Sequence, residues 1–150
     1  MPADNKSLVR RWFEEVWNQG REAVIDELLA PNGIALGLGE SDKPVRGPAE
    51  FKIFFHNLRT SFPDMHIAIE DTVAEDDKVA VRVKIEGTHL GDGLGVPASG
   101  RRMCVAGIII IRIANGKIVE GLNSWDQLGM LRQIGTLPAA DHDRFLSAQG

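Results

Sequence analysis

The stretch that decides the fold runs from Met103 to Trp125 and reads MCVAGIIIIRIANGKIVEGLNSW. At its centre stands Asn115-Gly116, a dipeptide that favours the two-residue turn of a β-hairpin because both residues tolerate positive φ. We therefore predict two antiparallel strands, at residues 103–114 and 117–125. The first strand is so continuously apolar that we expect it to be covered on both faces.

Two further strands are predicted upstream of this hairpin, because apolar residues recur there at every second position. The first spans residues 65–69 and the second residues 79–85, with an acidic turn at residues 75–77 between them. Charged side chains fill the alternate positions of the second strand, which indicates one buried face and one wet face. The apolar positions are Met65, Ile67, Ile69, Val79, Val81, Val83 and Ile85.

The N-terminal third is predicted to be helical, since apolar residues recur there at helical spacing. A first helix is followed by a short one that Pro31 stops, and a third begins at Gly47-Pro48, with proline at an early helical position. A short C-terminal helix follows the last strand and ends at Gly135. The fold class is therefore α+β: a cone-shaped, curved antiparallel sheet packed on the N-terminal helices. We expect one domain over residues 1–150, with a core at about 5–135 and a polar tail at 136–150.

Composition and charge exclude several classes of function. The net charge of −4 argues against a nucleic-acid partner. The longest apolar run, residues 105–111, is too short to span a membrane, and the lone Cys104 allows no intrachain disulfide. The four histidines match no metal-binding spacing, so we expect no metal. Residues 1–11 are polar and charged, without the apolar core of a signal peptide, so a cytoplasmic location is expected by default. Glycines in residues 90–100 suggest a mobile loop near a pocket rim.

Asp126 is the candidate for chemistry. It ends the last strand, and simple alternation places it on one side with Ile118, Glu120, Leu122 and Ser124 unless a bulge intervenes. The alternative is that Asp126 caps the following helix. Ser124 and Gln127 form a capping-box pattern of their own, which would leave the Asp126 carboxylate free.

His89 is the second candidate. It continues the inward alternation of Val79, Val81 and Val83, so its imidazole is expected to point into the cavity. The alternative is a histidine whose hydrogen bonds are satisfied within the core or rim.

Several motifs in order along the chain resemble the SnoaL-like polyketide cyclases, over roughly residues 5–135. The resemblance implies the cone-shaped fold shared with ketosteroid isomerase, and a cofactor-independent intramolecular aldol condensation that closes a ring. The family's catalytic acid/base falls on Asp126 and its pocket histidine on His89. The motifs are Val16-Trp17-Asn18-Gln19-Gly20, Gly47-Pro48, Ser61-Phe62-Pro63-Asp64, Gly87-Thr88-His89-Leu90-Gly91, Gly95-Val96-Pro97-Ala98-Ser99-Gly100-Arg101, Gly116-Lys117-Ile118-Val119-Glu120 and Trp125-Asp126-Gln127-Leu128-Gly129-Met130-Leu131-Arg132-Gln133-Ile134-Gly135.

The predicted substrate is an apolar, enolisable small molecule. Ala35 and Leu36 stand where many members of the family carry polar residues, and the chain contains no tyrosine. The pocket is therefore expected to be more apolar than in those members. A binding protein without turnover, or isomerase, dehydratase or epoxide-hydrolase chemistry on the same scaffold, remain alternatives. The predicted pocket wall consists of Trp17, Leu36, Phe55, Leu122 and Trp125.

A homodimer is also predicted. Ile108 and Ile110 belong to the outer face of the expected sheet, and apolar side chains on an open sheet face need covering.

Overall fold

The computed structural model describes residues 2–39 and 42–137, so most of the tail predicted at 136–150 lies outside the described residues. Helices come first and a strand meander follows, as the sequence predicts. The elements are α1 (Pro2–Arg11), a π-helical segment η1 (Trp12–Asn18), α2 (Glu22–Leu28), β1 (Leu29–Leu36), β2 (Val45–Arg46), α3 (Gly47–Ser61), β3 (His66–Glu75), β4 (Lys78–Thr88), β5 (Arg102–Ala114), β6 (Lys117–Trp125) and α4 (Gln127–Gln133).

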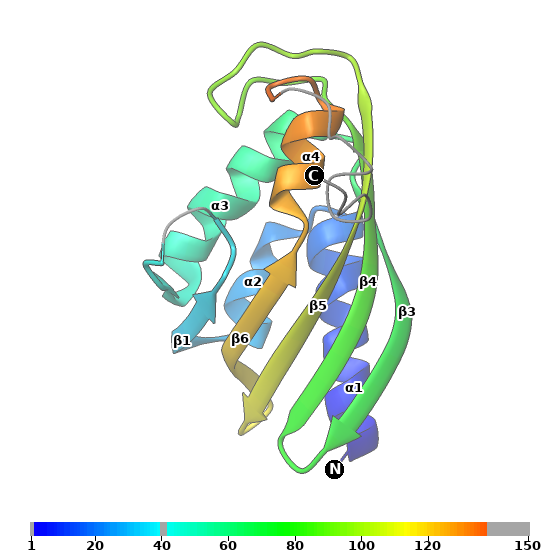
Figure 1. The fold of residues 1–150 in the computed structure, drawn as a ribbon. Helices are drawn as coiled ribbons and strands as arrows, with labels where there is room; N and C mark the ends of the chain where they lie inside the picture. The colour runs from blue at the N-terminus through cyan, green and yellow to red at the C-terminus, as the bar shows by residue number, and fades with distance from the viewer. Residues whose placement is uncertain (1, 40–41, 138–150) are drawn as a thin grey trace.

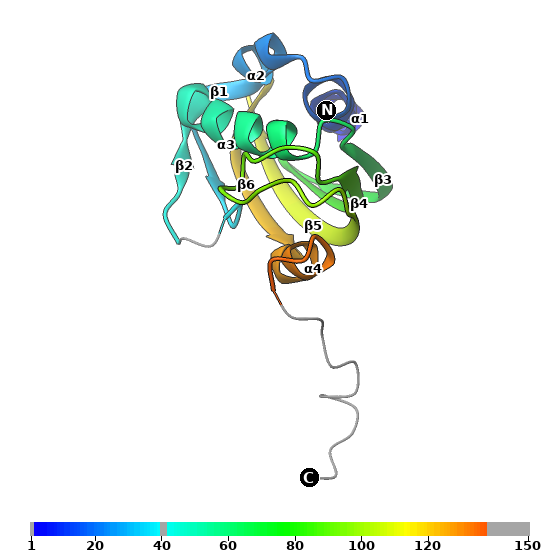
Figure 2. The ribbon, with the colours of Figure 1, turned by 90° about the horizontal axis from the view of Figure 1, so that it is seen from above.

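The strands form one open sheet in the order β2-β1-β6-β5-β4-β3. Neighbouring strands are antiparallel except β1 and β6, which run parallel, so the sheet is mixed rather than purely antiparallel. It curves around α1, α2 and α3, while α4 continues from β6 on the other side of the sheet (Figures 1 and 2). The predicted α+β class with a curved sheet on N-terminal helices is confirmed.

The hairpin of β5 and β6 forms as predicted. Asn115 and Gly116 adopt φ values of 53° and 73°, which are the left-handed values that its two-residue turn requires. The expectation that the strand at 103–114 is covered on both faces is wrong within this chain. Burial along β5 alternates strictly, and Ile108 and Ile110 on the outer face are 53% and 41% exposed.

A β-bulge interrupts the pairing of β5 with β6. Arg112 pairs with Glu120 but Ile113 pairs with Ile118, so Val119 is an extra residue on β6. An extra residue shifts the alternation by one position, and every side chain that follows it changes face. Arg112 and Glu120 form an ion pair across the hairpin, at 3.7 Å.

The bulge overturns the predicted inward set of β6. Ile118 is buried on the concave face, but after the bulge Gly121, Asn123 and Trp125 face that side. Leu122 and Ser124 are exposed on the outer face instead. The amide of Asn123 therefore reaches the concave side, which sequence alternation had assigned to its neighbours.

The helix α3 shows how the core is built. It begins at Gly47 with Pro48 in its first turn, and its stripe of Phe51, Phe55 and Leu58 is buried. Fully burying a side chain of this size contributes about 1.5–3 kcal/mol. The rings of Phe51 and Trp17 meet edge to face at 5.9 Å between centroids, so α3 and η1 share one aromatic layer above the sheet.

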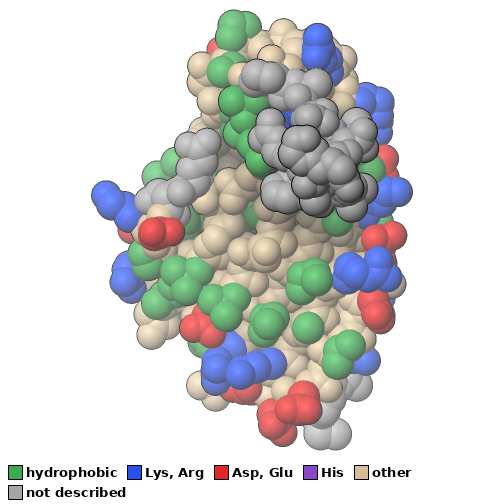
Figure 3. Space-filling view, viewed as in Figure 1, with side chains coloured by type: hydrophobic (Ala, Val, Ile, Leu, Met, Phe, Trp, Pro, Cys, Tyr) green, Lys and Arg blue, Asp and Glu red, His purple; other side chains and the backbone are tan. Residues whose placement is uncertain are grey.

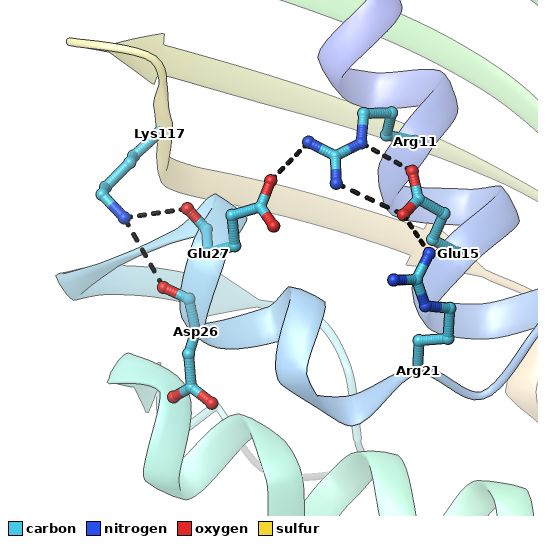
Figure 4. Close-up of polar contacts among 6 residues, drawn as sticks. All are labelled: Arg11, Glu15, Arg21, Asp26, Glu27 and Lys117. Carbon is cyan, nitrogen blue, oxygen red and sulfur yellow. Dashed lines mark hydrogen bonds and ion pairs between the residues drawn. The ribbon is translucent and has the colours of Figure 1, made fainter.

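Charged side chains join the N-terminal elements to one another (Figure 4). Arg11 of α1 binds Glu15 of η1 and Glu27 of α2, and Arg21 binds the same Glu15. Hydrogen bonds from Arg11 hold the pKa of Glu15 and of Glu27 below the ordinary range. Lys117 at the start of β6 donates to the main-chain oxygen of Glu27 at 2.8 Å. Arg21 and Glu27 are exposed and Arg11, Glu15 and Lys117 are only half-buried, so the network fixes the arrangement of the elements more than it stabilises the fold.

Candidate active site

An apolar cavity of about 80 Å³ lies between the helices and the concave face of the sheet. All three tryptophans of the chain belong to its wall. The lining residues are Trp12, Phe13, Trp17, Leu29, Ile34, Ala35, Leu38, Phe51, Phe54, Leu58, Met65, Ile67, Val83, Ile85, Ile109, Ile111, Ile118, Gly121, Asn123 and Trp125. No acidic or basic side chain belongs to this wall, as far as the described residues go.

Four of the lining residues are only half-buried, namely Ile34, Phe54, Asn123 and Trp125. They come from β1, α3 and the end of β6. The remaining lining residues are buried. The accessible side of the cavity therefore lies where these three elements meet.

The cavity wall is closely fitted where the end of β1 meets β6. Gly37 has a φ of 77°, and a Cβ atom on it would lie 1.9 Å from the main-chain oxygen of Asn123. The indole nitrogen of Trp125 donates to the oxygen of Leu38 at 3.0 Å. The Gln127 amide donates to the main-chain oxygens of Gly37 and Gly39 at 3.4 and 3.3 Å. Backbone and side-chain contacts thus hold residues 36–39 against residues 123–127.

Asp126 is the N-cap of α4. Its Oδ1 accepts a hydrogen bond from the main-chain nitrogen of Gly129 at 2.8 Å, and the residue is exposed. The expectation that Ser124 would cap the helix is wrong, because Ser124 is still paired within β6, opposite Ile108. Asp126 therefore follows the cavity-lining Trp125 directly in the chain, but its carboxylate is not part of the cavity wall.

The absence of a side chain at Gly129 makes room for the Asp126 carboxylate. A Cβ atom at position 129 would lie 2.2 Å from Oδ2 and 2.6 Å from Cγ of Asp126. The first turn of α4 therefore holds the carboxylate in one orientation. Oδ1 is used by the helix, while Oδ2 has no hydrogen-bond donor among the described residues.

His89 is fully buried, but it does not line the cavity. The main-chain nitrogen of Ser99 donates to its Nδ1 at 3.1 Å, and the Ser99 hydroxyl lies 2.9 Å from the same atom. A neutral ring that accepts at Nδ1 carries its proton on Nε2, and this nitrogen is buried without a partner among the described residues. His89 therefore holds the loop that contains Ser99 and is not part of the cavity wall, where strand alternation had placed its imidazole.

The glycine-rich loop that follows His89 is hydrogen-bonded to the end of α3. Main-chain nitrogens of Leu90 and Gly91 donate to the oxygen of Ser61 at the end of α3, at 2.9 and 3.2 Å. Cβ atoms on Gly91 and Gly93 would lie 2.0 and 2.2 Å from the main-chain oxygens of Thr60 and Asn57. Two of the glycines are therefore required by close approach to α3.

Comparison with known proteins places the chain in a family. The model of the SnoaL-like polyketide cyclases matches residues 7–134. The chain belongs to the SnoaL-like polyketide cyclase family.

Curated relatives and solved structures agree with this assignment. The aklanonic acid methyl ester cyclases DauD of Streptomyces sp. (strain C5) and DnrD of Streptomyces peucetius are each 33% identical over 130 residues, or 85% of this chain and 80% and 88% of theirs. A structure from Jannaschia sp. CCS1, assigned to the SnoaL-like polyketide cyclases, superposes with a TM-score of 0.82 at 27% identity, over 91% of this chain and 95% of that one. The predicted family is therefore confirmed.

In this SnoaL-like protein the residues predicted for the pocket wall fall in two groups. Trp17 and Trp125 line the cavity, whereas Leu36, Phe55 and Leu122 do not. Phe55 is buried in the core, 5.4 Å from the Trp17 ring between centroids. Leu36 pairs with Leu122 in the parallel register of β1 and β6, and the bulge turns Leu122 to the outer face. Ala35 and Leu38 contribute to the wall in place of Leu36.

Sequence reasoning missed Asn123, the one side-chain amide among the described residues of the SnoaL-like cavity wall. Gly121 inside a predicted strand was the available signal, because a glycine in a strand often marks a bulge nearby. Among the described residues, no group of three or more His, Cys, Asp and Glu side chains is arranged to hold a metal ion. The same part of the chain has no helix long and apolar enough to cross a membrane.

Proposed function

We propose that this protein is a cofactor-independent cyclase, which closes a ring in an apolar, enolisable polyketide-like molecule by intramolecular aldol addition. The observation that carries the proposal is the apolar cavity, walled by three tryptophans, in a chain 33% identical to aklanonic acid methyl ester cyclases. An apolar wall suits a fused-ring polyketide and excludes water, which would protonate an enolate.

The proposed acid/base is Asp126. Its carboxylate removes a proton from the carbon next to one carbonyl, and the resulting enolate attacks a second carbonyl carbon of the same molecule. The protonated carboxyl then returns the proton to the new alkoxide. One carbon–carbon bond forms, nothing is oxidised or reduced, and the product is an isomer of the substrate.

Two features support Asp126 in this role. Its Oδ2 has no donor among the described residues and its orientation is held by Gly129. The cavity of about 80 Å³ is also smaller than the roughly 300–1,000 Å³ of sites for drug-sized ligands. A fused-ring substrate would therefore project from the accessible side, beside the end of β6 where Asp126 follows Trp125.

His89 is proposed to act indirectly. Its buried ring contacts Ser99 and lies 5.6 Å from Phe62 between centroids, so it positions the loop of residues 90–100 rather than touching substrate. The loop in turn rests on the end of α3.

The test uses purified protein and aklanonic acid methyl ester, the compound in the names of the relatives. We expect a product of unchanged mass and changed retention by liquid chromatography with mass detection. The variant Asp126→Asn should abolish turnover while keeping the fold, because asparagine is an equally good N-cap and can accept the Gly129 hydrogen bond. Full turnover by a correctly folded Asp126→Asn variant would show that Asp126 is only a cap.

A second candidate function is binding of an apolar small molecule without turnover. It is favoured by one specific observation, that no acidic or basic side chain belongs to the described cavity wall. The two candidates separate in one experiment, because a binder would give a calorimetric signal with the ester and no product after prolonged incubation.

We also propose a homodimer that forms through the outer face of the sheet. Ile110 pairs with Leu122, which pairs in turn with Leu36, so apolar side chains cross three strands on this face. Ile108, Ile110 and Leu122 are 53%, 41% and 40% exposed, and hydrophobic side chains are visible between charged ones across this face (Figure 3). Exposed apolar groups that form such a row are typical of an interface. A cytoplasmic location stays a prediction.

A further inference from the structure

The side-chain amide of Asn123 is an unusual group for the wall of this cavity. Asn123 is half-buried and pairs across the sheet with Ile109, another lining residue. It faces the cavity only because the bulge at Val119 shifts the alternation of β6. The other lining side chains are aliphatic or aromatic, apart from the thioether of Met65 and the hydrogen of Gly121.

The hydrogen bonds of Asn123 fix which end of the amide is free. Its Nδ2 donates to the main-chain oxygen of Leu36 at 2.9 Å and to that of Gly121 at 3.4 Å. The reversed amide would place Oδ1 against two carbonyl oxygens, so this orientation is the one that the network assigns. Both amide hydrogens are thereby used, and Oδ1 has no donor among the described residues.

Among the described residues of the wall, the other side-chain acceptor is the thioether of Met65, which accepts hydrogen bonds only weakly. The tryptophan indoles carry donors only, and that of Trp125 is already used by the Leu38 oxygen. The wall is therefore asymmetric: one fixed acceptor in an apolar surface. A donor group of a bound ligand can pair with Oδ1 of Asn123. An acceptor group buried at the same place loses its hydrogen bonds to water and gains none from Oδ1, which is itself an acceptor.

We propose that Oδ1 of Asn123 accepts a hydrogen bond from an enol or phenol hydroxyl of the bound ring, and so determines its orientation and the selection of hydroxylated ligands. This deepens the proposed function, since it names a feature of the substrate, but it requires only that the cavity binds the ring. An enol form at this position, rather than a methyl ether, is the chemistry that the site selects.

The test compares three flat probes by isothermal titration calorimetry: 2-naphthol, its isostere 2-methylnaphthalene, and the slightly larger 2-methoxynaphthalene. The wild-type protein should bind 2-naphthol about tenfold more tightly than 2-methoxynaphthalene, although the ether is the more apolar. Equal or tighter binding of the ether, or no binding of any probe, would overturn the proposal without use of any variant.

The variant Asn123→Leu supplies the second measurement. The ratio of the dissociation constant of 2-methylnaphthalene to that of 2-naphthol should fall about tenfold relative to wild type. An unchanged ratio in a folded variant refutes the role of Oδ1. A protein that keeps the preference for 2-naphthol but does not convert aklanonic acid methyl ester would refute the proposed cyclase activity and leave this inference standing.

Discussion

Replacement of Gly37 by alanine tests the fit between the end of β1 and β6. Gly37 has a φ of 77°, and left-handed backbone costs a residue with a Cβ atom about 1–2 kcal/mol. The Cβ atom would also lie 1.9 Å from the main-chain oxygen of Asn123, so the two strands must separate by more than an ångström. Overpacking of this kind costs about 1–3 kcal/mol more. We expect Gly37→Ala to lower the free energy of unfolding by about 2–5 kcal/mol.

Two other glycines separate these contributions. Gly116 has a φ of 73° but open space around it. Gly116→Ala should therefore lower the free energy of unfolding only by the cost of the left-handed backbone, about 1–2 kcal/mol. Gly39 has neither a left-handed φ nor a neighbour within 4 Å, and Gly39→Ala should change stability by less than about 0.5 kcal/mol. Urea unfolding followed by tryptophan fluorescence measures all three, since every tryptophan lines the adjoining cavity. A Gly37→Ala variant no less stable than Gly116→Ala would refute the close approach of β1 to β6.

Three further predictions follow from single contacts. Gly129→Ala should displace the Asp126 carboxylate and reduce cyclase turnover severalfold. Thermal stability should change little, because the loss of a cap worth about 1 kcal/mol is offset by the better helix propensity of alanine. Normal turnover by this variant would count against a catalytic role for Asp126. Burial raises the pKa of Asp64, but hydrogen bonds from Thr88 outweigh it and hold that pKa below its ordinary value, so this carboxylate stabilises the fold above about pH 4 and the contribution disappears as the pH falls through the lowered pKa. The stability difference between wild type and Asp64→Asn should therefore shrink in acid unfolding curves, and a constant difference would contradict the shift. Ile110→Lys should give the mass of a monomer by light scattering at concentrations where wild type is a dimer, and identical masses would exclude this face as the interface.

The parts of the fold that could be predicted from the sequence depend on local signals. Asn115-Gly116 specifies its turn through the positive φ that both residues tolerate, and Pro48 suits the first turn of a helix. The strand β1 was not predicted, because Pro31, Asn32 and Gly33 within it are typical of loops. It becomes a strand through parallel pairing with β6, about 90 residues later in the chain, and antiparallel pairing with the two-residue β2, which no local pattern reveals.

The candidate site was less predictable, because one inserted residue changes the face of all that follow. Regular alternation assigned Leu122 to the cavity, whereas the bulge at Val119 gives that place to Asn123. Because Ser124 and Trp125 are still paired with β5, Asp126, two residues after Ser124, becomes the cap of the helix. A bulge depends on how two strands match in length and twist, which the residues of one strand do not specify.

The two polar groups that the proposals use, the amide of Asn123 and the carboxylate of Asp126, lie in different surroundings. An amide in the apolar wall can bind a hydroxylated ring without the burial of a charge, which would be far more costly. The Asp126 carboxylate, three residues later, stays exposed at the end of the strand and remains free to exchange a proton. Affinity and turnover should therefore respond to different residues. Substitution of Asn123 should change the dissociation constant of hydroxylated ligands, and substitution of Asp126 should lower kcat with little effect on binding, a division expected only if the ring lies in the cavity and its reacting carbons lie at the accessible side.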